Sequence, residues 1–350
     1  MKTLSTEPVQ ALTSEGSKSK AIYAALLLLV IVGALVTYKA TAALGVIHKV
    51  QSTGAFQPRT NVLPVPGSNL QINVFRRSLN YFWVIGLALI FGILISGVVR
   101  VLVTPRRWTQ LLGNGYLRPQ LVGGVAGMPL MLCSCCVAPV FSTMYERSAR
   151  LGPSLATALA APSLNPAALI LTFMLFDPRI AVTRLIAAIL AVFLATAAVE
   201  RLFKTRLKAC SLGFEDTEPL TVRAFLRSWG QVALRTVPLI VVGVVVSMIV
   251  ARWLPFGILA STWGKLVAIV VVALIAVPLA MPTFFEIPLA LILISAGAPA
   301  GAAVAMLIAG PAINLPSLFT ITRATNWKVA ATVAGFILAL AIAGGLLVSL

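Results

Sequence analysis

The chain has 350 residues, of which 59% are hydrophobic and 10% are charged, with a formal net charge of +18 and a mean hydropathy of +1.00. A soluble protein cannot hide that much apolar surface, so the composition predicts an all-α, polytopic integral membrane protein. Strand-type alternation is absent, which argues against an outer-membrane barrel. The basic residues lie at helix ends, where they anchor to anionic lipid rather than bind nucleic acid. Four cysteines and one histidine are too few for a disulfide scaffold.

The N-terminal part predicts a membrane anchor. We expect residues 1–20, which are rich in Ser, Thr, Glu and Lys, to be disordered, and residues 21–44 to form a leader transmembrane helix. The small residues 40–42 resemble the cleavage site of a secretory signal. The apolar run is long for such a signal, which favours an uncleaved signal-anchor. Residues 45–80 then form a polar link.

The remainder is an internal duplication, with a first repeat over 81–203, a basic loop over 204–230 and a second repeat over 231–350. A short basic amphipathic piece at 105–118 is typical of a segment in the membrane interface. With the leader, we expect about nine transmembrane segments. The eight in the repeats lie near 82–103, 121–143, 152–176, 179–203, 232–253, 265–293, 301–321 and 328–349.

Repeat-related prolines indicate broken helices. An offset of 149 residues matches Pro129 with Pro278, Pro139 with Pro288, Pro162 with Pro311 and Asn165 with Asn314, and Pro166 nearly matches Pro316. Proline inside a transmembrane helix frees a carbonyl, and broken backbone survives there only when it is buried in protein or lines a wet cavity. A substrate site between discontinuous helices has this signature, although simple kinks are the alternative.

The orientation of the repeats stays open. The basic central loop and Arg76-Arg77 favour a cytoplasmic start for both repeats, but other basic residues then fall on the wrong side. If one proline-broken segment in each half enters and leaves the membrane on the same side, each half crosses the membrane an odd number of times and the two halves are inverted. If all four segments of each half cross, the halves are parallel. Transporters use both schemes.

Three thiols fall within four residues, at Cys133, Cys135 and Cys136, between Pro129 and Pro139. On a regular helix Cys133 and Cys136 share a face and Cys135 points elsewhere, but on a broken segment all three can converge. Thiolates select soft, thiophilic species, and the motif lacks the His or Asp partners of a closed zinc site. The alternative is that these cysteines only pack as small hydrophobes.

Three polar residues interrupt the apolar segments. Asn165 and Asn314 either cap half-helices or line a substrate path, and the two roles can coexist. Glu286 lies between prolines in the second repeat, where the first repeat has Val137. An acid inside an apolar span is a functional-site candidate, for a coupling proton or a cationic substrate; the alternative is a carboxyl at a helix end that reaches solvent.

The stretches PLMLCSCCVAPV, GPSLATALAAPSLNP and PTFFEIPLALILISAGAPAGAAVAMLIAGPAINLPSL resemble the ArsP-type predicted permease family of bacteria and archaea over most of residues 82–349. Some members export trivalent organoarsenicals with the motif thiols. The resemblance matches Cys133 and Cys135 to the motif cysteines, Pro139 to the following proline, and Pro162/Asn165 and Pro311/Asn314 to the paired turns. Cys136 departs from the family pattern, because small residues are more usual there.

The resemblance implies a multi-pass permease of the bacterial cytoplasmic (inner) membrane rather than an enzyme. We expect a secondary transporter that exports a small soft solute, a trivalent arsenical or soft metal species, with Cys133, Cys135, Cys136, Asn165, Asn314 and Glu286 as substrate-binding residues. The expected partners are the lipid bilayer and the substrate, with no nucleic acid and no cofactor; a homo-oligomer stays open. No P-loop occurs in the chain.

Three other functions stay open. A membrane thiol-disulfide electron relay needs a partner pair of cysteines, which the second repeat does not offer. A neutral-solute channel is suggested by residues 165–167, Asn-Pro-Ala, although the matching turn reads Asn-Leu-Pro. A structural subunit of a larger complex would leave Glu286 and the cysteines unexplained.

Overall fold

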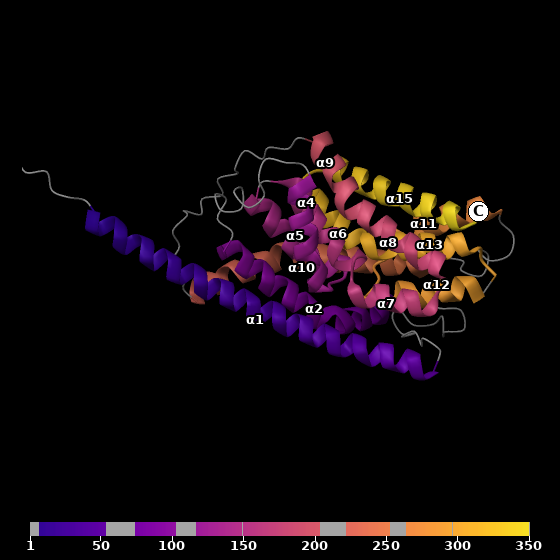
Figure 1. Cartoon of the computed structure of the whole chain (residues 1–350), viewed down its shortest axis with the longest axis horizontal. Helices are drawn as coiled ribbons and strands as arrows, with labels where there is room; N and C mark the ends of the chain where they lie inside the picture. Colours follow the sequence, from indigo (N-terminus) through magenta and orange to yellow (C-terminus); the bar gives the residue numbers. More distant parts are fainter. Residues whose placement is uncertain are drawn as a thin grey trace, which may run out of the picture.

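The computed structural model describes residues 7–53, 74–102, 117–148, 150–203, 222–252, 264–295 and 297–349, and every element within them is helical. The first helix, α1 (Glu7–Thr53), lies along one side of a bundle formed by the others, and its N-terminal part extends past the bundle (Figure 1). It begins within the stretch expected to be disordered and continues into the expected polar link. The expected interface piece at 105–118 lies almost entirely outside the described residues.

The first half begins with one long helix and continues as a series of short ones. In chain order these are α2 (Val74–Leu102), α4 (Leu117–Gly127), the 3-10 turn η1 (Met128–Leu130), α5 (Ser134–Ser148), α6 (Leu151–Ser163), α7 (Pro166–Leu175), α8 (Pro178–Ile189), the π-helical turn η2 (Leu190–Ala195) and α9 (Thr196–Phe203). The last three follow one another without a break and form one long helix.

The second half repeats this order. It consists of α10 (Val222–Arg252), α11 (Lys265–Ala276), α12 (Glu286–Ser295), α13 (Ala300–Ala312), α14 (Leu315–Ala324) and α15 (Trp327–Ser349). The bounds of α13 and α14 are those of α6 and α7 at an offset of 149 residues. The duplication is therefore visible in helix boundaries as well as in residue identities.

The described residues do not confirm the expected nine membrane spans. Within the described residues, five helices are long and apolar enough to cross a membrane, and two bent pairs bring the total to seven. The pairs are α6 with α7, bent by 41°, and α13 with α14, bent by 44°. The expected segments 121–143 and 265–293 occur instead as short helices on either side of a break, because their prolines and polar residues interrupt the helix.

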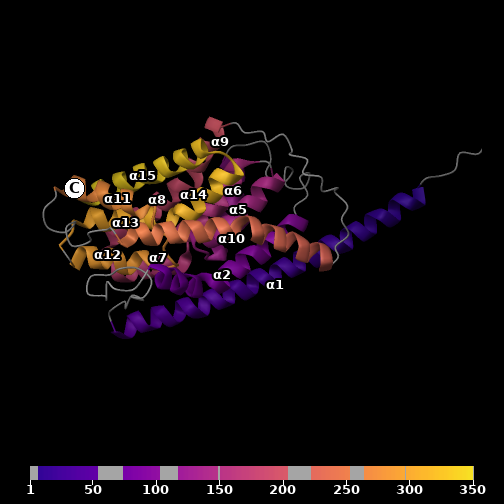
Figure 2. The ribbon, with the colours of Figure 1, turned by 180° about the vertical axis from the view of Figure 1, so that it is seen from behind.

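The two halves are inverted relative to each other. In Figures 1 and 2 the colour gradient shows that α2 and α10 run in opposite directions, and so do the long helix α8–η2–α9 and its counterpart α15. The first half thus starts at one end of the bundle and finishes at the other, and the second half returns. An odd number of crossings in each half produces this arrangement, as in transporters with inverted repeats. A cytoplasmic start for both repeats is therefore wrong.

Because the halves are inverted, more basic residues lie at one end of the helix bundle than at the other. The end of α9 lies beside the starts of α4 and α6, because Glu200 bonds Gln120 and Arg150. Among the described helix termini, those at this end carry Arg100, Arg118, Arg147, Arg150, Arg201, Arg223, Arg227, Arg323 and Lys328. The described termini at the opposite end carry fewer, namely Lys49, Arg76, Arg77, Arg179, Arg252 and Lys265.

Because basic residues concentrate on the cytoplasmic side, we expect the α9 end to face the cytoplasm. Single cysteines at two exposed positions, Arg227→Cys near the start of α10 and Lys265→Cys at the start of α11, test this in a Cys210→Ser background. An impermeant maleimide should label Lys265→Cys in intact cells, and Arg227→Cys only after permeabilisation. The reverse labelling pattern would contradict this orientation.

Small residues let the long helices approach the broken segments. A Cβ atom on Gly92 of α2 would lie 2.2 Å from the carbonyl oxygen of Cys136, and one on Gly243 of α10 would lie 2.7 Å from the backbone of Pro316. Contacts this close leave no room for any other residue. Each long helix is therefore packed directly against the backbone of a proline-containing element.

We expect Gly92→Ala to destabilise the protein by about 1–3 kcal/mol, because the new methyl group must displace the backbone beside the cysteines. Gly86→Ala in the same helix is the matched control. A Cβ there meets no atom within 4 Å, so its effect should stay within about 1 kcal/mol. Thermal unfolding in detergent measures both variants, and equal effects would contradict the close packing at Gly92.

Candidate functional site

The first broken segment runs from Met128 to Cys133. Pro129 lies within η1, and Met131, with a left-handed φ of 47°, ends that turn. The carbonyl of Cys133 then accepts hydrogen bonds from the N–H groups of Cys136 and Val137, which begins α5. This places the first thiol immediately before α5 and the other two in its first turn.

The three thiol groups converge at this point. Cys133 Sγ lies 2.8 Å from Cys136 Sγ and 3.1 Å from Cys135 Sγ, and the other pair is 3.9 Å apart. All three are buried and unoxidised. The hydroxyl of Tyr81, on α2, lies 3.1 Å from Cys135 Sγ. The geometry matches the converging arrangement expected of a broken segment rather than that of a regular helix.

The second broken segment lies between α11 and α12. Its backbone includes Pro278 and passes through Phe284, which has a left-handed φ of 73°, and α12 begins at Glu286 with Pro288 in its first turn. The offset of 149 places Phe284 and Phe285 where the first half has Cys135 and Cys136. The break is thus repeated with different side chains.

Serines of the long helices donate hydrogen bonds to carbonyls of α5 and of the second broken segment. Ser96 of α2 donates a hydrogen bond to the carbonyl of Pro139 at 2.9 Å, and Ser247 of α10 donates one to the carbonyl of Pro278 at 2.7 Å. Ser96 also bonds Thr143. In hydrocarbon an unpaired carbonyl costs several kcal/mol, so the bond from Ser247 allows the chain to leave the helical conformation at Pro278.

Asn165 and Asn314 cap the second helices of the bent pairs. The Oδ1 of Asn165 accepts from the N–H groups of Ala167 and Ala168, and the Oδ1 of Asn314 accepts from the N–H of Ser317. Both side chains are fully buried, and within the described residues neither Nδ2 has a partner. The capping role is therefore present, and each amide keeps two free donors.

The four prolines of the bent pairs flank these caps. Pro162 and Pro311 lie in the last turns of α6 and α13, and Pro166 and Pro316 lie in the first turns of α7 and α14. A proline in the first turn loses no helical hydrogen bond, because its missing N–H would have no partner there. Each pair of prolines therefore ends one helix and starts the next.

Glu286 forms an ion pair across the two halves. Its Oε1 accepts a hydrogen bond at 2.8 Å from Nη2 of Arg184 on α8, and the two side chains are 4% and 1% exposed. Arg184 Nη1 also bonds Thr172 of α7. The alternative of a carboxyl that reaches solvent is therefore wrong. Arg184 was missed at the sequence level, although a lone cation inside an apolar segment was the available signal.

A small cavity lies between the two broken segments. Its walls include Cys133 and Ser134 from the first half and Thr283 and Glu286 from the second, with Pro162 and Pro311 beside them. It leaves about 10 Å³ for the centre of a water molecule, which is room for about one water. Among the expected site residues, Cys133 and Glu286 thus meet at one cavity, whereas Asn165 and Asn314 do not line it.

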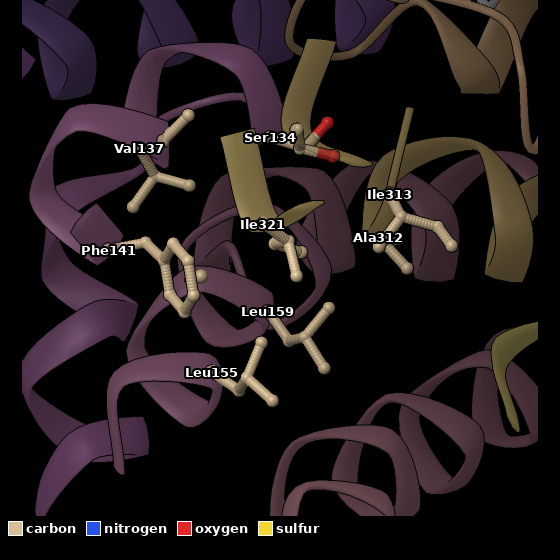
Figure 3. Close-up of a pocket in the computed structure, with 11 residues that line it drawn as sticks. Ser134, Val137, Phe141, Leu155, Leu159, Ala312, Ile313 and Ile321 are labelled. Atoms are coloured by element: carbon tan, nitrogen blue, oxygen red, sulfur yellow. The ribbon is translucent and has the colours of Figure 1, made fainter. Parts of the chain in front are cut away.

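A second cavity continues on the other side of Ser134. Figure 3 shows it between apolar side chains, with Phe141 and Leu155 on one side and Ala312 and Ile313 on the other. It has the same small size. Because Ser134 lines both cavities, they mark a path that starts at the thiols and runs between α5, α6 and α14. The described conformation closes this path to anything larger than water.

We expect Glu286→Gln to destabilise the protein by about 3–5 kcal/mol, because it leaves the buried Arg184 charge without an anionic partner. The double variant Arg184→Met/Glu286→Met should recover most of that loss. Glu146→Gln is the control, since its pair with Arg235 is exposed and 3.9 Å long and contributes at most about 1 kcal/mol. Unfolding in mixed micelles compares the three, and equal losses in Glu286→Gln and Glu146→Gln would contradict the prediction.

Comparison with known proteins finds relatives that are named as UPF0718 proteins. The chain is 28% identical over 249 residues to the UPF0718 protein YraQ of Escherichia coli, covering 70% of this chain and 71% of that protein. It is 20% identical over 338 residues to the UPF0718 protein MJ0584 of Methanocaldococcus jannaschii, covering 77% and 92% of the two chains. No solved structure matches the chain.

The family termed ArsP_1, described as predicted permeases, matches residues 72–350. The matched range includes both halves and both broken segments, and it starts after α1. Such a family indicates a multi-pass membrane transporter rather than an enzyme. The chain belongs to the ArsP_1 family of predicted permeases.

Proposed function

We propose that this permease is a secondary transporter of the bacterial inner membrane that exports a small thiophilic solute, a trivalent arsenical or a soft metal species. The observation that supports the proposal most is the cluster of three buried sulfurs, all within 4.8 Å of one another, at the edge of the cavity between the halves. Thiolate sulfur binds soft ions in preference to hard ones. Three such ligands in the membrane interior exceed what packing requires.

The inverted halves suit an alternating-access carrier. Transporters of this type bind substrate at the interface of two inverted repeats and rock one repeat against the other. Here Cys133 belongs to the first half and Glu286 to the second, and the cavity that both line has no room for a solute. We interpret this as an occluded conformation, in which solute would enter only after the halves separate.

The path beyond the thiols supports a carrier more than a channel. Its lining is mostly apolar, and each of the two cavities on it holds about one water. A channel for neutral solutes needs a continuous path with hydrogen-bonding groups. Asn165 and Asn314 line neither cavity, but their free amide donors become available to a polar solute or a water once the bent pairs move apart.

A second function, a thiol-disulfide relay, is favoured by one distance, the 2.8 Å between Cys133 Sγ and Cys136 Sγ. These two sulfurs are close enough to form a disulfide with little movement. Electron transfer across the membrane also needs a second redox pair. The three cysteines in the described residues all belong to this cluster, and Cys210 lies outside them, so transport is the better supported function.

Cells that express the protein should accumulate less of one soft element than cells that express Cys133→Ser/Cys135→Ser/Cys136→Ser at matched membrane levels. The reason is that serine oxygen binds soft ions poorly. The measurement is the cellular content of arsenic (including methylated trivalent forms), antimony, zinc, cadmium, copper and mercury. Cys210→Ser is the control and should behave as the wild type.

Equal contents across this panel would overturn the thiophilic substrate. Reversible oxidation of Cys133 and Cys136 that follows the redox state of a partner protein would instead support the relay.

A further inference from the structure

A lysine occupies the middle of the leader helix. The apolar part of α1 that is long enough to cross a membrane runs from Leu26 to Thr53, and Lys39 lies at its midpoint. A charged side chain at the centre of a bilayer is costly and usually has a functional partner inside the protein. Because the family match starts at residue 72, Lys39 is outside the part of the chain that the family describes.

The helix α1 presents Lys39 to the bundle. Leu35 and Ala43, one turn before and one turn after it, are buried, and Tyr38 stacks on Phe91 of α2 with ring centroids 6.4 Å apart. The Nζ of Lys39 donates a hydrogen bond at 3.5 Å to the hydroxyl of Thr283. The half-buried lysine therefore points inward, to the second broken segment, rather than to lipid.

Thr283 connects the lysine to the thiols. It lines the cavity between the broken segments together with Cys133 and Ser134. The cavity is therefore bordered by Cys133 of the first half and by Thr283 and Glu286 of the second, and α1 holds a cation against Thr283.

The charges around the cavity do not balance. Glu286 is paired with Arg184, so this pair contributes no net charge. Among the described residues no carboxylate lies within ion-pair distance of Lys39. One positive charge thus contacts Thr283, at the cavity that Cys133 also lines, in a region of low dielectric where an uncompensated charge is expensive. An anion formed by the thiols themselves would compensate it.

We propose that Lys39 is the counter-charge of an anionic three-thiolate complex, and that the site takes a soft divalent cation of the cadmium, zinc or mercury type. A divalent ion with Cys133, Cys135 and Cys136 as thiolates has a net charge of −1, which one ammonium cancels. The complex forms three metal–sulfur bonds, the thiol protons leave to solvent, and nothing is oxidised or reduced. This inference rests on the proposed function and names its substrate class.

The sulfur positions are compatible with such a complex after a small expansion. In a planar three-coordinate site with metal–sulfur bonds of about 2.3 Å, the sulfurs are about 4.0 Å apart. The longest of the three separations here, 3.9 Å between Cys135 and Cys136, already has this value, and the other two must lengthen by about 1 Å. Cys133 precedes the helix, so its side chain can make this movement.

A trivalent arsenical behaves differently. Phenylarsine oxide reacts with two thiols to form two arsenic–sulfur bonds and one water, and the product is neutral. Its binding needs no counter-charge. Lys39 therefore distinguishes the two kinds of substrate: removing its charge should weaken the binding of a divalent ion and leave the binding of phenylarsine oxide unchanged.

The test titrates the purified full-length protein with two probes. Cd²⁺ binding is followed by cadmium–thiolate absorption, and phenylarsine oxide binding by the loss of titratable thiols. We expect Lys39→Gln to weaken Cd²⁺ binding at least tenfold, Lys39→Arg to restore it to within about threefold, and both variants to bind phenylarsine oxide as the wild type does. Lys49→Gln is the matched control, because Lys49 is exposed near the end of the same helix.

The outcomes separate the two proposals. If Lys39→Gln binds Cd²⁺ as tightly as the wild type, the counter-charge role of Lys39 is overturned. The proposed function still stands in that case if Cys133→Ser/Cys135→Ser/Cys136→Ser binds neither Cd²⁺ nor phenylarsine oxide. If Lys39→Gln binds neither Cd²⁺ nor phenylarsine oxide, the lysine is required for the structure of the site, and the counter-charge role is also overturned. If the triple serine variant binds both probes as tightly as the wild type, the proposed function itself fails.

Discussion

Unpaired backbone groups in the membrane interior are the constraint on which this structure depends. Each half contains a stretch where prolines end one helix before the next begins, and lipid offers the freed carbonyls no hydrogen bond. The protein supplies such a partner through Ser247, which donates to the carbonyl of Pro278 in the second broken segment, and Ser96 donates to the carbonyl of Pro139 within α5. These serines come from α2 and α10, the long first helices of the two halves. Both long helices pack closely against proline-containing elements, and Gly92 and Gly243 make that close packing sterically possible.

The buried charges follow from the same arrangement. Burying Arg184 and Glu286 costs several kcal/mol for each ion, which their mutual attraction offsets only with good geometry. The 2.8 Å contact and the additional bond to Thr172 provide that geometry. Because Arg184 belongs to α8 and Glu286 to α12, the pair holds the first half against the broken segment of the second. A rearrangement that separates the halves has to break this pair or carry it along, so the ion pair and the cavity beside it are coupled.

The sequence predicted the positions of the helix breaks better than the side-chain partners of the buried charges. Prolines at matching positions identify the interruptions in α6–α7 and α13–α14, because proline acts on its own neighbours and needs no tertiary information. Convergence of the thiols also followed from local chain geometry. The partner of Glu286 did not, because Arg184 is 102 residues away and only the packing of α8 against the second half brings the two together. Lys39 was missed for a related reason, since one charge in an apolar helix does not reveal which side faces protein. The inversion of the halves depended on how many segments cross, which composition alone does not decide.

The two halves have kept the same break and changed its side chains. Where the first half has Val137 the second has Glu286, and where the first has Cys135 and Cys136 the second has two phenylalanines. Two identical halves would present the same groups twice, at two equivalent places. Here soft ligands lie on one side of the interface and a carboxylate, already neutralised by Arg184, on the other. With that carboxylate compensated, the charge that we propose acts at the cavity comes from outside the duplication, on Lys39 of α1. Under this proposal the features that choose a solute lie in the parts that the two halves do not share.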